Sequence, residues 1–162
     1  MRSAPAVARR AVLISRKSAP HDMTAERFVL DASVAIDWFL PGGGSRSRYA
    51  EDILERIGAE ELLPTVPDLW HYELGSVLIA AKRDKRFSAA KLRASQVAIR
   101  ELRLETLAVE LDAAELIDLS QRYHLQGYDV VYFELARRLT IPIASLDGGI
   151  KAACVVFGVE FL

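Results

Sequence analysis

Short apolar runs alternate with amphipathic helical patterns from Arg27 to the end of the sequence. The apolar runs predict strands over residues 27–31, 62–66, 107–111, 141–146 and 159–162, and the amphipathic patterns predict helices over 32–40, 49–58, 68–85, 88–103, 112–123, 129–139 and 149–157. This alternation favours an α/β fold with a mostly parallel central sheet, because each parallel pair of strands needs a crossover connection. No strand separates the helices over 68–85 and 88–103, so we expect them to form a helical hairpin.

The first 22 residues differ in composition from the remainder. They hold five basic residues and one acid. An Arg-rich, acid-poor leader can resemble an organellar transit peptide. Met23 offers a simpler explanation, because translation from it would place the first strand at the amino terminus. We therefore interpret residues 1–22 as a mis-called start or a disordered extension, and residues 23–162 as one domain whose sequence has enough apolar content for a sizeable core.

Composition excludes several classes of site. The formal net charge is -1, so any binding of a polyanion must come from local basic patches. The single cysteine, Cys154, excludes an intrachain disulfide framework and a Cys-rich zinc site, and its apolar neighbours predict a buried structural thiol. His21, His71 and His124 lack the spacing of a zinc site. No apolar run approaches the roughly 20 residues of a membrane span, and we expect a cytoplasmic protein without a membrane partner.

Four carboxylates lie where a strand or turn leads into a helix. Asp31 and Asp147 end two predicted strands, Asp129 begins a predicted helix, and Glu73 lies one turn inside another. The carboxyl ends of strands in an open α/β sheet meet at the ligand site, so these acids are expected to gather there. Their mutual repulsion calls for a cation, and oxygen ligands suit Mg²⁺ or Mn²⁺. Each acid alone is also compatible with a helix cap or a solvated position, whereas the ordered set of four is more specific.

Three segments carry a resemblance to a known family: VLDASVAIDWFLP at 29–41, VPDLWHYELGSVL at 66–78 and GYDVVYFELARRLTIPIASLDGGI at 127–150. With them, the chain from residue 28 to 162 resembles the PIN-domain ribonucleases, most closely the VapC-like toxins of bacterial toxin-antitoxin pairs. The resemblance implies a PIN-like three-layer α/β/α fold with a mostly parallel central sheet and a protruding helical hairpin.

The resemblance also implies an activity and its residues. By motif match, Asp31, Glu73, Asp129 and Asp147 are the catalytic metal ligands for Mg²⁺ or Mn²⁺, and Ser33 and Ser145 orient carboxylates or water around them. The implied reaction is hydrolysis of RNA phosphodiester bonds by water, which leaves 5′-phosphate and 3′-hydroxyl ends. The implied partners are an RNA substrate and a small cognate antitoxin, and a homodimer is expected.

Three positions depart from the family pattern or compete with the metal ligands. Gly127 stands where the family often has a Ser or Thr cap, so the loop before Asp129 is expected to be more mobile. Glu134 lies five residues after Asp129, on a different helix face, and we interpret it as a surface residue. Asp37 lies six residues after Asp31, and an exposed helix position is favoured over ligation.

Local clusters of cations are the candidates for RNA binding. They comprise Arg46 and Arg48 after a flexible glycine run, and Lys82, Arg83, Lys85 and Arg86 at the expected hairpin tip. Solvated surface charge is the favoured alternative for both groups.

Two other functions remain open from the sequence. A phosphoryl-transfer enzyme of another α/β class could use Asp31 as a nucleophile, although it would leave Glu73 unexplained. A housekeeping PIN nuclease or a non-catalytic PIN module that binds RNA is the second alternative. The complete set of four acids argues against a non-catalytic module.

Overall fold

The computed structural model describes residues 25–162, so the interpretation of residues 1–22 falls outside the described part of the chain. A four-stranded parallel sheet lies at the centre, with strand order β3-β2-β1-β4. Its strands are β1 (Glu26–Leu30), β2 (Leu62–Pro67), β3 (Glu105–Leu107) and β4 (Ile143–Ala144). Val29 of β1 pairs with Thr65 on one side and with Ile143 on the other. Phe28, Val29 and Leu30 are fully buried, as expected for a central parallel strand that is covered on both faces.

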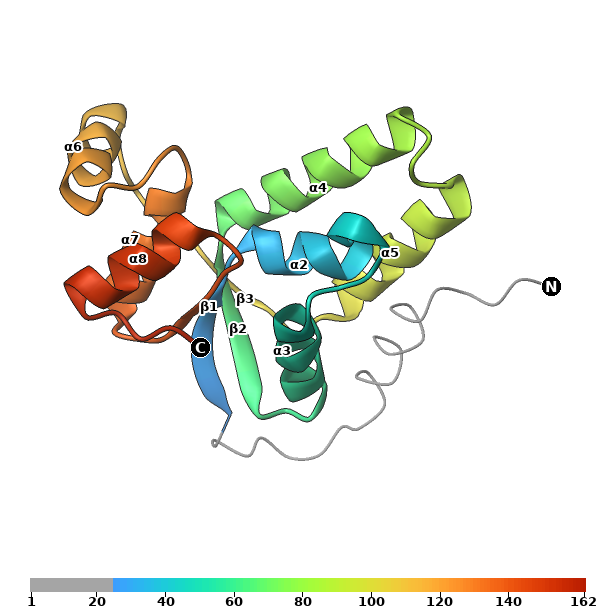
Figure 1. The fold of residues 1–162 in the computed structure, drawn as a ribbon, viewed down its shortest axis with the longest axis horizontal. Coiled ribbons are helices and arrows are strands. Elements are labelled where there is room, and N and C mark those ends of the chain that lie inside the picture. Colours follow the sequence, from blue (N-terminus) through green and yellow to red (C-terminus); the bar gives the residue numbers. More distant parts are fainter. Residues whose placement is uncertain (1–24) are drawn as a thin grey trace.

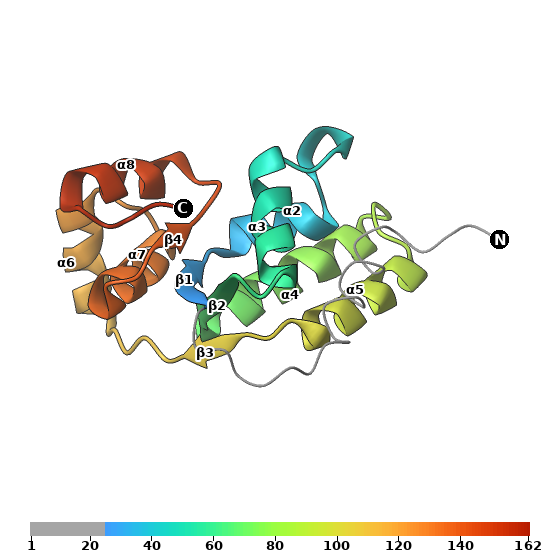
Figure 2. The same ribbon diagram turned by 90° about the horizontal axis from the view of Figure 1, so that it is seen from below.

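Helices cover both faces of this sheet, which confirms the predicted three-layer α/β/α arrangement. In Figure 2, α6, α7 and α8 lie on one side of the strands and α2, α3, α4 and α5 on the other. Their bounds are α2 (Ala32–Phe39), the short 3₁₀ helix η1 (Gly42–Gly44), α3 (Arg48–Gly58), α4 (Asp68–Arg83), α5 (Ala89–Glu101), α6 (Ala113–Tyr123), α7 (Asp129–Leu139) and α8 (Gly148–Phe157).

The predicted hairpin is formed by α4 and α5, which extend together away from the sheet (Figure 1). Phe87 in the connection is 2% exposed and so anchors the tip of the hairpin. Ser88 caps α5 by accepting a hydrogen bond from the Lys91 backbone N–H at 3.1 Å. At the other end of the hairpin, Asp68 is the first residue of α4, as the sequence predicts, and Pro67 is its N-cap.

The predicted strands differ from the observed ones at the edges of the sheet. The third strand was expected at 107–111, but β3 ends at Leu107, which pairs with Pro67. The ion pair of Glu105 with Arg27 at 2.5 Å ties this earlier segment to β1. The fourth strand is shorter than 141–146 because the Ile141 N–H donates to the carbonyl of Ala136 and so closes α7. The expected terminal strand is reduced to a single bridge between residues 143 and 161.

Cys154 is 2% exposed, as the sequence predicts for a structural thiol, and burial raises its pKa to about 11. A thiol with a raised pKa is a poor nucleophile and a poor metal ligand. Among residues 25–162, no helix is long and apolar enough to cross a bilayer.

Asp37 has a structural use that the sequence did not indicate. Its Oδ2 accepts a hydrogen bond from the Ser47 backbone N–H at 2.8 Å, and the Ser47 hydroxyl accepts one from Ala50 N–H at 3.1 Å. Asp37 therefore joins α2 to the start of α3 and is partly buried, not simply exposed.

The interpretation of Glu134 as a surface residue is wrong. Its side chain is 3% exposed and lies inside a cluster of partners. Arg137 donates two hydrogen bonds to it at 2.8 Å, Arg138 donates one at 2.7 Å, and the Tyr123 hydroxyl donates one at 3.1 Å. The Arg137 guanidinium, with Arg138 and Tyr123, lowers the pKa of Glu134 to about 2 despite its burial. Because opposite charges and a hydroxyl saturate the carboxylate, it can lie in the core.

We expect Glu134→Gln to lower the free energy of unfolding by about 2 kcal/mol at neutral pH, since it replaces charge-assisted hydrogen bonds with weaker neutral ones. The folded-state pKa lies below the ordinary value of 4.5, so this stabilisation should fade as pH falls from about 4.5 through about 2. Urea denaturation at several pH values measures both effects. Glu61→Gln is the matched control, because its ion pair with Arg56 is 3.7 Å long and 61% of the Glu61 side chain is exposed. Equal loss in both variants would contradict the role of Glu134.

Candidate active site

Asp31 occupies the carboxyl end of the central strand β1 and is only 5% exposed. Its backbone N–H donates to the carbonyl of Ala144 in β4 at 3.0 Å, which aligns the two strand ends. Its Oδ2 accepts hydrogen bonds from the hydroxyls of Ser33 and Ser145, the latter at 2.6 Å. Two hydroxyl donors therefore fix the orientation of this carboxylate.

The same two hydroxyls also hold the loop that carries Asp147. The Leu146 backbone N–H donates to Ser33 Oγ at 3.0 Å, and the Asp147 N–H donates to Ser145 Oγ at 2.9 Å. Asp147 is the N-cap of α8, where its Oδ1 accepts from the Ile150 N–H at 2.9 Å. Asp147 is thus a helix cap, which was one of the interpretations that the sequence left open. It also belongs to the same hydrogen-bonded network as Asp31.

Glu73 comes from α4 and is held by a residue of α7. The hydroxyl of Tyr132 donates a short hydrogen bond to Glu73 Oε2 across the interface of these helices. Tyr132 is 1% exposed, and burial together with Glu73 raises the pKa of its phenol, which keeps it a donor. Tyr132 is not among the site residues predicted from the sequence. The sequence pattern that could have indicated Tyr132 is its spacing of three residues from Asp129, because residues three apart lie on one face of a helix.

Asp129 begins α7 and is the acid on which the charges of the other three act. Burial raises its pKa to about 6, with further contributions from Asp147, Asp31 and Glu73, in that order. The structure therefore brings the four predicted acids within electrostatic range of one another. Three of them come from strand ends or helix starts at one edge of the sheet, and Glu73 lies one turn inside α4.

Burial also raises the pKa of Asp31, against the opposing effect of its serine donors. The pKa of Glu73 is raised by burial and by the charge of Asp31, while the Tyr132 hydroxyl acts in the opposite direction. The raised pKa values mean that these acids resist ionising together. A bound cation would relieve the repulsion among their negative charges.

The chemistry of the four acids fits a hard divalent cation. Carboxylate oxygens are the donors that Mg²⁺ and Mn²⁺ prefer, and burial together with the repulsion among these acids raises the pKa of Asp129. Within residues 25–162, however, no three His, Cys, Asp or Glu side chains form a ready-made group of metal ligands. The four acids thus act on one another at electrostatic range and not as a closed coordination shell.

The candidate RNA-binding cations differ in their exposure and in whether other residues already pair with them. Arg46 has a side chain only 13% exposed, and its Nε donates to the Trp38 carbonyl at 3.2 Å, so it has a structural use. Arg48 is exposed at the start of α3. At the hairpin tip, Arg83 and Arg86 lie 3.3 and 3.9 Å from Asp84, which offsets part of their charge.

The hairpin cations also lie at a distance from the acids. Lys82 follows Glu73 by nine residues on α4, a separation of roughly 14 Å along the helix axis. Lys82 and Lys85 are exposed, and Lys85 adopts a left-handed backbone conformation with φ 58°. These positions separate the hairpin cations from the acids by more than two turns of α4.

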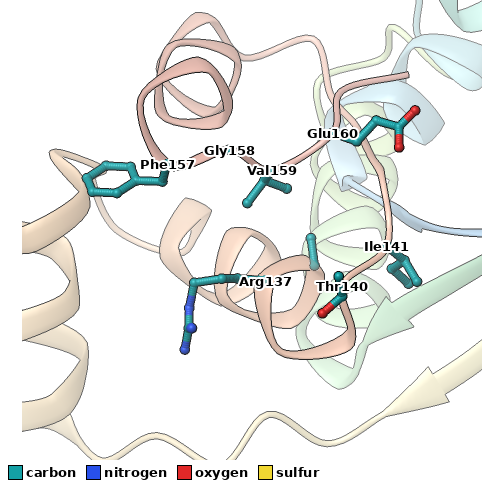
Figure 3. Close-up of a pocket in the computed structure, with 8 residues that line it drawn as sticks. Arg137, Thr140, Ile141, Phe157, Gly158, Val159 and Glu160 are labelled. Carbon is teal, nitrogen blue, oxygen red and sulfur yellow. The ribbon is translucent and has the colours of Figure 1, made fainter.

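A hollow of about 220 Å³ lies at the opposite end of α7 from the acids (Figure 3). It is lined by Arg137 in the last turn of α7, by Thr140, which caps that helix, and by the chain from Phe157, the last residue of α8, to Glu160. Arg137 follows Asp129 by eight residues, roughly 12 Å along the axis of α7. This hollow is therefore separate from the four carboxylates.

Comparison with known proteins agrees with this geometry. Residues 28–156 match the family described as the PIN domain. The fold is similar to the crystal structure of PAE2754 from Pyrobaculum aerophilum, with a TM-score of 0.58 and 20% sequence identity over 82% of this chain and 87% of that chain. At that identity the likeness supports the fold alone. A search of curated proteins finds no match.

Proposed function

This chain belongs to the PIN-domain family, whose members are generally nucleases, and from that premise we propose that it is a metal-dependent ribonuclease acting as the toxin of a toxin-antitoxin pair. The observation that supports the proposal best is the convergence of four carboxylates. Asp31 and Asp147 are joined through the hydroxyl of Ser145, and burial together with the charges of Asp147, Asp31 and Glu73 raises the pKa of Asp129. A nuclease needs such a concentration of oxygen donors to bind a cation beside a phosphate.

PIN domains typically bind divalent metals, and Asp31, Glu73, Asp129 and Asp147 would hold Mg²⁺ or Mn²⁺ here. When bound, the ion supplies Lewis-acid stabilisation of phosphate charge and lowers the pKa of water. The hydroxyls of Ser33 and Ser145 keep Asp31 in one orientation, and Tyr132 does the same for Glu73. Such supporting donors commonly change metal affinity or activity by about 10- to 100-fold.

Water is the proposed nucleophile, and the products would be 5′-phosphate and 3′-hydroxyl ends. Attack by the ribose 2′-hydroxyl would call for a pair of acid-base groups such as histidines. His71 is instead hydrogen-bonded to Thr106 Oγ1 at 3.0 Å, beside β3.

The rival phosphoryl-transfer enzyme needs Asp31 as a free nucleophile. Asp31 is 5% exposed and its Oδ2 already accepts two hydroxyl donors, which disfavours attack by that oxygen. The phosphoryl-transfer mechanism also assigns no role to Glu73, which Tyr132 holds in place by a hydrogen bond. A housekeeping PIN nuclease remains the second candidate, since it would use the same four acids.

The proposed partner is a small antitoxin, encoded beside this chain, whose carboxyl-terminal segment covers the acids in the cytoplasm. An Arg or Lys from that segment would pair with the carboxylates and exclude the cation. The homodimer that the family resemblance implies remains a prediction.

Expression of the chain alone should arrest growth of a bacterial host, and coexpression of the neighbouring small gene should restore growth through a stable complex. Growth curves and copurification measure the two effects. The control is Asp31→Asn, which should be harmless at the same expression level because it removes a ligand charge. A harmless wild-type chain that cuts RNA in vitro would contradict the toxin role and favour a housekeeping nuclease.

A further inference from the structure

A hollow of about 420 Å³ opens between the first turn of α4, the segment that follows β3, and the first turn of α7. Its apolar lining includes Leu69, Val109, Leu111, Leu116 and Val131. Its volume falls in the range of roughly 300–1,000 Å³ that is typical of small-molecule sites. The four acids of the candidate active site do not line this hollow.

Tyr128 also lines the hollow, and more than half of its surface is exposed. It exposes 57% of its surface, immediately before Asp129 in the chain. An aromatic ring that is open to solvent beside an apolar pocket provides a stacking surface for a planar ligand.

Two helices, α4 and α7, each contribute residues both to the hollow and to the candidate active site. Leu69 lies four residues before Glu73 on α4, and Tyr128 lies four residues before Tyr132 at the start of α7. Residues four apart share a helix face and are about one turn, or 5.4 Å, apart along the axis. Because Tyr132 and Glu73 are hydrogen-bonded, Tyr128 and Leu69 lie about one turn from that contact on the same sides of their helices.

We propose that this hollow binds one nucleobase of the RNA, next to the phosphate that is cut, with the base stacked on Tyr128. The proposal rests on the proposed nuclease function and adds a substrate-positioning residue to it. One helix turn is comparable to the spacing between neighbouring nucleotides, so a phosphate beside the acids would bring an adjacent base to the hollow. Apolar walls would take the faces of the base.

The polar lining indicates which bases fit. Asp68 and Glu110 are the acidic residues of the hollow, and ionised carboxylates only accept hydrogen bonds. They favour a base edge that carries an exocyclic amino group, as adenine, cytosine and guanine do, and they disfavour the carbonyl-rich edge of uracil. The hollow should therefore discriminate against uridine at this position.

The test compares Tyr128→Ala and Tyr128→Phe with the wild-type protein on short single-stranded RNA. Loss of the ring should raise KM about tenfold and change kcat by less than about twofold, because stacking on an aromatic residue acts in binding. Tyr128→Phe keeps the ring and should match the wild type. Tyr72→Ala is the matched control, since Tyr72 is 72% exposed on α4 and does not line the hollow.

A second measurement separates this inference from the nuclease proposal. Fluorescence anisotropy in an Asp31→Asn background measures binding of labelled RNA that is intact or has one abasic position. Intact RNA should bind about tenfold more tightly, and Tyr128→Ala should abolish this difference. Oligouridine should bind more weakly than oligoadenosine or oligocytidine, and Asp68→Asn with Glu110→Gln should reduce that preference.

The outcomes are distinct. Cleavage by the wild type with an unchanged KM in Tyr128→Ala would overturn the base pocket and leave the nuclease proposal standing. If RNA binding depends on the Tyr128 ring but the wild-type protein cuts no RNA, the result would support the base pocket and overturn the nuclease proposal. An equal loss in Tyr128→Ala and Tyr128→Phe would overturn stacking, because it would assign the effect to the hydroxyl.

Discussion

Purified protein should cut RNA in Mg²⁺ or Mn²⁺ and should lose this activity completely in excess EDTA. The reason is electrostatic: burial and three neighbouring carboxylates raise the pKa of Asp129, so without a cation this site repels a phosphate. Gel analysis of a labelled RNA measures the cleavage, and the labelled products should carry 5′-phosphate ends. Restoring Mg²⁺ after chelation should restore the activity, which excludes irreversible damage.

The same cation should also be detectable without catalysis. A ligand that binds only the folded chain stabilises it, by about 2.7 kcal/mol at 100 times its Kd. Thermal unfolding of the protein should therefore shift upward with Mg²⁺ or Mn²⁺ concentration. Activity that survives chelation would rule out the metal mechanism, and products with cyclic phosphate ends would rule out water as the nucleophile.

Asp31→Asn and Asp129→Asn should each slow RNA cleavage by about three orders of magnitude. Each keeps the size of the side chain and removes one ligand charge from a site whose cation contributes several kcal/mol to the transition state. Glu73→Gln and Asp147→Asn should act in the same direction. Single-turnover rates at saturating Mg²⁺ measure the loss. Asp118→Asn is the matched control, because Asp118 is exposed on α6, a helix that carries none of the four acids.

These variants should fold at least as well as the wild type. The folded-state pKa of Asp129 is raised to about 6 from an ordinary 3.8, so metal-free wild-type protein should lose stability as pH rises through this interval. Asp129→Asn lacks this titration and should have a higher denaturation midpoint at neutral pH. Wild-type rates in either Asp variant would refute the assignment of the site, whereas a misfolded variant would show a lower midpoint.

Local patterns predicted the centre of the fold well. The apolar run before Asp31 has the composition of a strand buried on both faces, and β1 is such a strand. The caps of α5 and α6 were also predictable, because Ser88 and Asp112 act on N–H groups three residues away. The edges were less predictable. At β3 and β4, pairing with β2 and β1 and the closure of α7 decided where each strand ended.

Glu134 shows why a charged residue was misplaced. Glutamate is rarely buried unless it is paired, so its sequence position alone favours the surface. Its partners Arg137 and Arg138 were visible in the sequence at helical spacing, but the hydroxyl of Tyr123 comes from α6. Burial of this carboxylate depended on α6 packing against α7.

The sequence by itself determined the α/β class and named the four acids, because strand and helix periodicities and the residues that end them are local. Only the tertiary structure decided how those acids are held. The bond from Tyr132 to Glu73 spans 59 residues, and the contact of Ser145 with Asp31 spans 114. Such contacts form only when separate strands and helices pack together. Burial of apolar side chains leaves a periodic pattern in the sequence, but the pairing of particular polar side chains from distant elements leaves none.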